Sequence, residues 1–197
     1  MNTMRKSLIY QMATLLLVTG SFRMQAQSQY SLLSGYAITI NGSSNVHDWT
    51  ETAVKTTGDA TITWTDGSFT INHLSLKIEV AAIESEHGSI MDNKTYDALK
   101  AKNYPYISFK MTSLKSMTKS GTGYLVKVMG DLTIAGKTRN VELTAMAYIK
   151  ENGKILFDGS RSLKMTEYGI DPPTAMMGAM QVGDDVTVKF KVYFGMK

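Results

Sequence analysis

The sequence contains no cysteine, and this absence excludes several classes of protein at once. A disulfide framework, a thiolate metal site and a catalytic cysteine are all excluded over its 197 residues. Proline is scarce as well, with 3 residues, whereas 16 glycines supply many turns. Many turns and few rigid linkers favour a chain built from strands rather than from linked modules.

A strong excess of charge of one sign is also missing. The chain has a formal net charge of +4, but Arg5, Lys6 and Arg23 lie in a segment, residues 1–26, that has no acidic residue. The remaining residues, 27–197, therefore carry a net charge of only +1. A balance this close to neutral argues against nucleic acid as a partner. Hydrophobic residues make up 43% of the chain, which is enough for one domain with a buried core.

The N-terminus has the order of a secretory signal peptide. Arg5 and Lys6 precede a mostly apolar run from Leu8 to Gly20, and Ala26 offers a cleavage point. The run is shorter than the roughly 20 residues of a membrane span, although an uncleaved anchor is the alternative. We therefore expect residues 1–26 to be a signal peptide and residues 27–197 to form one periplasmic or secreted domain.

Alternation of apolar and polar residues dominates the rest of the chain. Successive side chains of a strand point to opposite faces, so this alternation predicts strands with one apolar face. Residues 135–138 (AGKT) and 152–153 (NG) separate such runs and predict hairpin turns. The alternating segments are residues 36–40, 60–65, 74–80, 107–111, 124–128, 141–149 and 186–194.

One segment breaks the alternation and predicts a helix. Residues 89–102 contain no valine, glycine or proline, and Asp92 follows Ser89 at the spacing of a capping box. Lys100 and Lys102 suit the negative end of a helix, and Pro105 stops it. We expect one short helix over residues 92–102.

Strands that follow one another through short turns form an antiparallel sheet. About eight such strands can close into a barrel whose interior holds side chains or one small ligand. A β-sandwich would show the same alternation, so the alternation alone leaves barrel and sandwich open.

Several short segments follow one another along the chain: 44–49 (SNVHDW), 91–92 (MD), 98–101 (ALKA), 104–109 (YPYISF), 130–141 (GDLTIAGKTRNV), 168–170 (YGI) and 182–186 (VGDDV). In this order they resemble the YceI-like family of exported lipid-binding proteins. The resemblance implies an all-β, lipocalin-like antiparallel barrel of about eight strands with one short helix. It also implies an interior that holds a polyisoprenoid, an isoprenoid quinone or another long, fatty-acid-like lipid, and it carries over no catalytic residue. Two features depart from the family: Met165 stands where many members have arginine, and residues 172–177 (PPTAMM) form a distinct loop.

Inward-facing apolar residues are the candidates for the ligand-binding site. A cluster of Met176, Met177 and Met180 could gate a barrel mouth or simply pack in a loop, and Trp64 could contact a ligand or plug a barrel end. The interior could also be filled completely by side chains. The candidate lining residues are Ile62, Trp64, Leu76, Ile78, Phe109, Val126, Val128, Leu143, Met165, Met176, Met177, Val188 and Phe190.

No motif for metal, nucleotide or hydrolytic chemistry accompanies these residues. His47, His73 and His87 lack the spacing of metal ligands, so we expect no metal and no cofactor other than a bound lipid or isoprenoid quinone. Arg161, in register with apolar residues of its strand, is the one charge that could serve an enzyme, but it also suits a barrel mouth or a bulge.

The sequence therefore predicts a non-enzymatic protein that holds a long apolar ligand for transport, storage or sequestration. A secreted structural or interaction domain with a filled core is the alternative, followed by an enzyme acting on an isoprenoid-type substrate. We expect a long-chain lipid or isoprenoid as the partner and no nucleic acid. Transient contact with a membrane and a homodimer both stay open.

Overall fold

The structure is a computed structural model that describes residues 27–65 and 68–197. One α-helix, α1 (Ser89–Ala98), and four single-turn 3-10 helices interrupt the strands: η1 (Val80–Ala82), η2 (Glu151–Gly153), η3 (Thr166–Tyr168) and η4 (Met176–Gly178). The strands are β1 (Gln27–Leu32), β2 (Ala37–Ser44), β3 (Asp48–Ala53), β4 (Thr56–Thr65), β5 (Ser68–Glu79), β6 (Ile83–Ser85), β7 (Tyr106–Ser120), β8 (Gly123–Ile134), β9 (Lys137–Ile149), β10 (Ile155–Lys164), β11 (Thr174–Ala175) and β12 (Met180–Met196).

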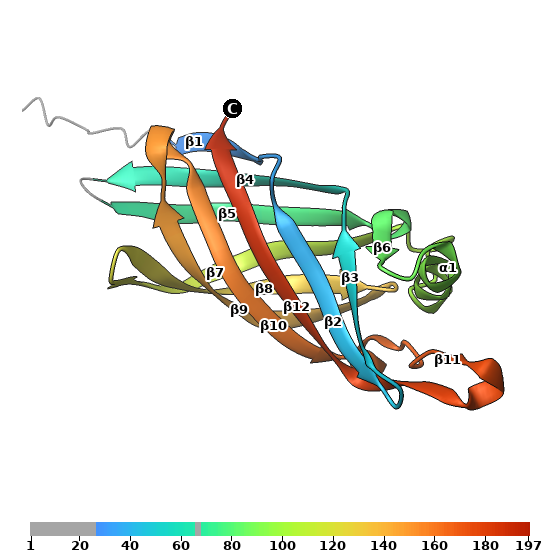
Figure 1. Ribbon diagram of the computed structural model, residues 1–197. Coiled ribbons are helices and arrows are strands. Elements are labelled where there is room, and N and C mark those ends of the chain that lie inside the picture. The colour runs from blue at the N-terminus through green and yellow to red at the C-terminus, as the bar shows by residue number, and fades with distance from the viewer. Residues whose placement is uncertain (1–26, 66–67) are drawn as a thin grey trace, which may run out of the picture.

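Eight of these strands close into a ring (Figure 1). β1, β4, β5, β7, β8, β9, β10 and β12 are antiparallel neighbours in this order, and β1 pairs back with β12 through Tyr30↔Met196 and Leu32↔Phe194. The ring confirms the predicted antiparallel barrel and rules out two separate sheets.

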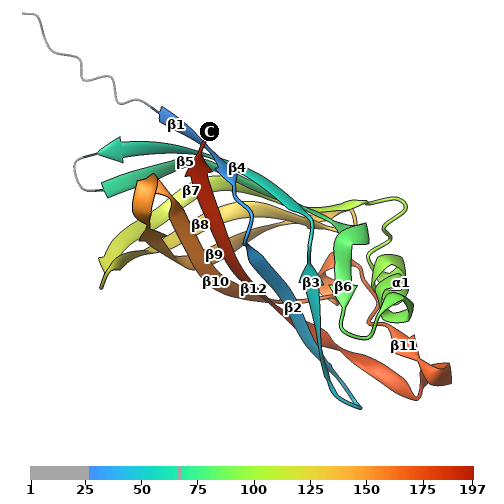
Figure 2. The same cartoon turned by 45° about the horizontal axis from the view of Figure 1, so that its top comes forward.

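β12 is the longest strand, and it has two neighbours along the same edge. Its C-terminal part pairs with β1, whereas its N-terminal part pairs with β2 through contacts such as Val188↔Ile40. β2 then pairs with β3, and β3 pairs with β6. β3, β6 and α1 lie together at one end of the barrel, and we call it the α1 end (Figures 1 and 2).

The elements agree with the alternation in the sequence. Each of the seven predicted segments lies in a strand, apart from one end residue at each of two segments. Both predicted hairpin turns are confirmed: Ala135 and Gly136 have φ of 48° and 80°, and Asn152 and Gly153 have φ of 58° and 68°. Two consecutive positive φ angles match the twist of antiparallel strands, which explains these residue choices.

The predicted helix bounds of 92–102 are wrong at both ends, because α1 covers Ser89–Ala98. Gly88, with φ of 76°, occupies the N-cap position and needs no side-chain cap. Asp92 does not form the predicted capping box; its Oδ1 accepts a hydrogen bond of 2.7 Å from the backbone N–H of Ser85. Lys100 has φ of 55°, which ends the helix before the two lysines can continue it.

Aromatic side chains fill the barrel at the end away from α1. Tyr30 and Phe69 are buried. The ring centroids of Trp64 and Phe69 lie 5.6 Å apart, and those of Phe69 and Tyr124 lie 5.5 Å apart. We call Tyr30, Trp64, Phe69 and Tyr124 the aromatic plug. It closes this end of the barrel, so any space for a ligand must lie toward α1.

Candidate ligand-binding site

A cavity of about 160 Å³, measured as the space open to the centre of a water molecule, occupies the middle of the barrel. We call it the inner chamber. The surface that faces it is apolar throughout. Eight of the predicted lining residues surround it: Leu76, Ile78, Phe109, Val126, Val128, Leu143, Val188 and Phe190.

A second cavity of about 140 Å³, the outer chamber, lies at the α1 end. It is bounded by β3 and α1 on one side and by the segment that joins β10 to β12 on the other. The two chambers are contiguous, because the same six residues line both. These shared residues are Ile40, Ile83, Ile107, Ile134, Leu163 and Val188. The barrel is therefore not filled by its own side chains.

The other predicted lining residues lie elsewhere. Met165 lines the outer chamber. Ile62 and Trp64 line neither chamber: Ile62 is fully buried in the core, and Trp64 belongs to the aromatic plug. Met177 is fully exposed and lines neither chamber. The side chain of Met176 lies outside what the structure describes.

Arg161 lies at the side of the inner chamber, where two strands separate. The β9–β10 ladder ends at the pair Gly159↔Ala145, and Arg161 spans the widening gap. Its Nη1 donates a hydrogen bond of 3.0 Å to the backbone oxygen of Glu142, while Nε is buried without a partner in the described residues. Since the chamber surface is apolar, the alkyl stem of Arg161 rather than its guanidinium faces the cavity.

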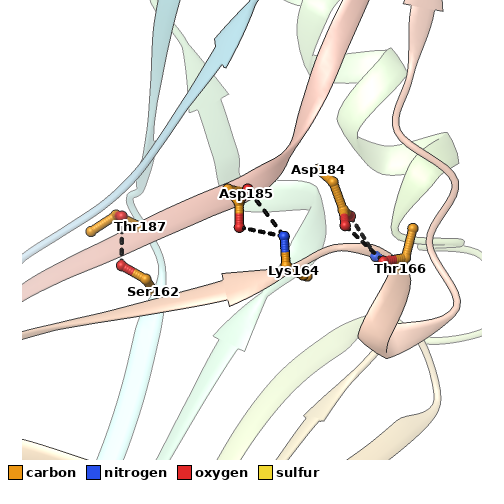
Figure 3. A network of polar contacts seen from close by, with 6 residues as sticks. All are labelled: Ser162, Lys164, Thr166, Asp184, Asp185 and Thr187. Atoms are coloured by element: carbon orange, nitrogen blue, oxygen red, sulfur yellow. Dashed lines mark hydrogen bonds and ion pairs between the residues drawn. The ribbon is translucent and has the colours of Figure 1, made fainter.

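A network of polar contacts fixes one wall of the outer chamber (Figure 3). The Asp184 carboxylate accepts hydrogen bonds of 2.8 Å from the backbone N–H and from the hydroxyl of Thr166. Lys164 forms an ion pair of 2.9 Å with Asp185, and Ser162 and Thr187 are joined by their hydroxyls. This network anchors the start of η3, so the neighbouring Met165 is held against the chamber.

The bonds from Thr166, first its backbone N–H and then its hydroxyl, lower the pKa of Asp184 below its ordinary value. Asp184 and Asp185 both lie inside β12. The β12–β2 register shifts between Val182 and Val186, so the two aspartates occupy a bulge.

Glu51, on the opposite wall, was not identified from the alternation of apolar and polar residues. Glu51 of β3 lines the outer chamber and is only 8% exposed. Its Oε1 accepts a hydrogen bond from the Thr95 hydroxyl of α1. Burial is the largest influence on Glu51 and raises its pKa; the bond from Thr95 opposes this, and the nearby charge of Asp92 adds to it.

Residues 27–65 and 68–197 contain no group of three or more His, Asp or Glu side chains that could hold a metal ion. In the same part of the chain, no helix has both the length and the apolar composition needed to cross a bilayer.

A family model described as the YceI-like domain matches residues 24–194. The chain belongs to the YceI-like family. The match covers almost the whole described barrel, so both chambers lie within the YceI-like domain. No curated protein matches the chain.

Solved structures share the fold of this YceI-like domain at low sequence identity. BcnA of Burkholderia cenocepacia is 19% identical with a TM-score of 0.62, over 80% of this chain and 95% of its own. A polyisoprenoid binding domain from Saccharophagus degradans, implicated in plant cell wall breakdown, is 13% identical with a TM-score of 0.65, over 85% and 98%. The YceI protein of Campylobacter jejuni is 23% identical with a TM-score of 0.56, over 75% and 84%.

Proposed function

We propose that this YceI-like protein is exported and holds one long apolar molecule in its two chambers, for transport, storage or sequestration. The ligand class is a polyisoprenoid, an isoprenoid quinone or a fatty-acid-like lipid. The observation that carries the proposal is the contiguous pair of chambers, closed by the aromatic plug at one end and apolar throughout its inner part. The Saccharophagus degradans relative, described as polyisoprenoid binding, supports the same ligand class.

The driving force is the removal of hydrocarbon from water. Each buried methylene contributes about 0.8 kcal/mol, so some twenty buried carbons contribute on the order of 10 kcal/mol before the costs of association and ordering. No polar partner is needed for this part of the ligand. The inner chamber meets the requirement, because its surface offers no polar group.

Binding rather than catalysis fits the inner chamber. A reaction there would need a titratable group aimed at the ligand. Arg161, the one charged residue of its lining, contributes its alkyl stem to the cavity and uses its guanidinium on the Glu142 carbonyl. Export rests on the signal-peptide pattern of residues 1–26, which lie outside the described residues.

Transient contact with a membrane would let the ligand enter without crossing water. Three exposed apolar side chains lie on segments near the outer chamber: Val46, Ile90 and Met177 are 63%, 75% and fully exposed. Asn45 bonds to the Ala179 oxygen at 2.9 Å, and the rings of His47 and His87 lie 5.4 Å apart, so these segments adjoin. We call residues 45–47, 87–90 and 177–179 the mouth. This surface would contact the lipid first.

A matched pair of tryptophan variants tests the binding site. Leu143→Trp should fill the inner chamber and remove binding of a fluorescent long-chain fatty acid analogue. Glu142→Trp, at the neighbouring exposed position of β9, should bind the analogue like the wild type, because the two side chains point to opposite faces. Equal binding by the wild type and Leu143→Trp would contradict the proposed site.

A further inference from the structure

Glu51 is an acid at an inward-facing position of a barrel strand. It lies between Trp49 and Ala53 on the same face of β3, and it pairs with Ile40 of β2 and Ser85 of β6. Of these neighbours, Trp49, Ile40 and Ser85 line the outer chamber with Glu51. A carboxyl group at such a position loses hydration on folding, which costs stability unless the group is well partnered.

The carboxyl group of Glu51 is only partly hydrogen-bonded. Its Oε1 accepts the bond from Thr95, but no described residue donates a hydrogen bond to Oε2. No ion pair involves Glu51 in the described part of the chain. Lys94, which also lines the chamber, points its Nζ to the Thr174 oxygen at 3.4 Å. The carboxyl therefore keeps hydrogen-bonding capacity for something inside the chamber.

The chamber around Glu51 has two unlike walls. Ser85 and Thr95 stand beside the carboxyl, and His47 and His87 stand at the rim. The facing wall carries apolar side chains, with Met165, Ile170 and Val186 among them. The inner chamber beyond is apolar throughout. An amphiphile would thus lie with its tail inside and its polar end beside Glu51.

We propose that Glu51 binds the polar end of the ligand and that this end is an uncharged hydroxyl group, so that the protein takes long-chain alcohols. This inference rests on the proposed lipid-binding function and names its ligand class. A hydroxyl can donate to the free oxygen of Glu51, or accept from the carboxyl when it is protonated. It also brings no charge that must be desolvated.

Charged head groups fit the same place less well. A carboxylate or phosphate would bring a second negative charge beside Glu51 and close to Asp92, which already acts on Glu51 electrostatically. An ammonium group would lose its hydration in a chamber that is mostly apolar, and Lys94, His47 and His87 line the same space. A hydroxyl avoids both costs.

The test compares probes of equal chain length in competition with a fluorescent fatty acid analogue: hexadecanol, palmitate and hexadecylamine. The wild type should bind hexadecanol most tightly. Glu51→Leu should bind hexadecanol about tenfold more weakly, the cost of one lost hydrogen bond, without weakening its binding of palmitate. Glu51→Gln should keep most of the affinity for hexadecanol, because its amide still makes hydrogen bonds. Glu84→Gln, at an exposed acid of β6, should behave like the wild type.

The outcomes separate the two proposals. If no variant and no wild-type protein binds any of the three probes, the lipid-binding function itself fails. If the wild type binds all three equally, or prefers palmitate or hexadecylamine, the function stands and the head-group inference is overturned. Unchanged hexadecanol binding by Glu51→Leu would overturn it too. Should Glu51→Leu not fold, Thr95→Val, which removes the bond that positions the carboxyl, should also weaken hexadecanol binding selectively.

Discussion

The indole Nε1 of Trp64 donates a hydrogen bond of 2.8 Å to the hydroxyl of Tyr30, and this pair closes the barrel at the end away from α1. The same hydroxyl donates to the backbone oxygen of Gly153 at 3.3 Å. One phenol therefore links β4, β1 and the β9–β10 turn. A closed end limits a ligand to the inner and outer chambers and makes the α1 end the route of entry.

Tyr30→Phe should destabilise the barrel without affecting the ligand. The substitution removes both bonds of the hydroxyl and leaves the Trp64 N–H without its acceptor, which should lower the free energy of unfolding by about 1–3 kcal/mol. Urea denaturation would measure this loss. Affinity for a fluorescent fatty acid analogue should stay at the wild-type value, because Tyr30 lines neither chamber. A large loss of affinity in a folded variant would mean that the ligand reaches the plug.

Glu51→Gln should change how stability depends on pH. Burial, the largest cause, raises the pKa of Glu51 above its ordinary value of 4.5, so folding favours the protonated carboxyl. Its contribution to stability is fully present below this ordinary value and is lost as the pH rises through the raised pKa. The wild type should therefore lose stability relative to Glu51→Gln as the pH rises from acidic to neutral. Urea denaturation of both proteins across this range would show it, and a constant difference would contradict it.

Asp184→Asn should show the opposite dependence. The bonds from Thr166 lower the pKa of Asp184, so the charged carboxylate stabilises the fold at neutral pH. That contribution is present above the ordinary value of 3.8 and is lost as the pH falls through the lowered pKa. The variant should be less stable than the wild type at neutral pH, with a difference that shrinks on acidification. Thermal denaturation at several pH values would measure it, and a difference that grew in acid would rule it out.

Met177 of η4 and Met180 at the start of β12 should affect different steps of binding. Met180 lines the outer chamber, so Met180→Ser should weaken equilibrium binding of a long-chain probe by about fivefold through lost apolar contact. Met177 is fully exposed at the mouth, so Met177→Ser should keep this affinity but slow transfer of the probe from lipid vesicles. Stopped-flow fluorescence with vesicle donors separates the two effects. Unchanged transfer by Met177→Ser would remove the gating role predicted for this methionine.

Alternation in the sequence predicted seven of the twelve strands and eight of the residues that line the inner chamber. Leu76, Ile78 and Phe109 line it because they lie on inward faces of paired strands, which a period of two reveals. The same signal could not separate Ile62 from these residues, because both kinds face inward. Whether an inward side chain meets a cavity or the core depends on its height in the barrel, and strand register sets that height.

The alternation of apolar and polar residues could not identify Glu51 as a site residue, for a different reason. It occupies an inward position where a period of two expects an apolar residue, so β3 gave no strand signal at all. Its partner Thr95 lies 44 positions away, on a helix whose bounds were predicted too late in the chain. Only the packing of α1 against β6, the strand paired with β3, brings the two together. Local sequence patterns therefore could not predict the outer chamber.

The most direct test is native mass spectrometry of the protein, purified without detergent from its native host, followed by analysis of an organic extract. We predict a folded protein that carries one bound long-chain molecule, released on extraction, and a Leu143→Trp variant purified in the same way that carries none. The contrary result is folded wild-type protein that carries no lipid in repeated preparations from cells and from medium. That result would contradict the claim that the two chambers hold a long-chain lipid.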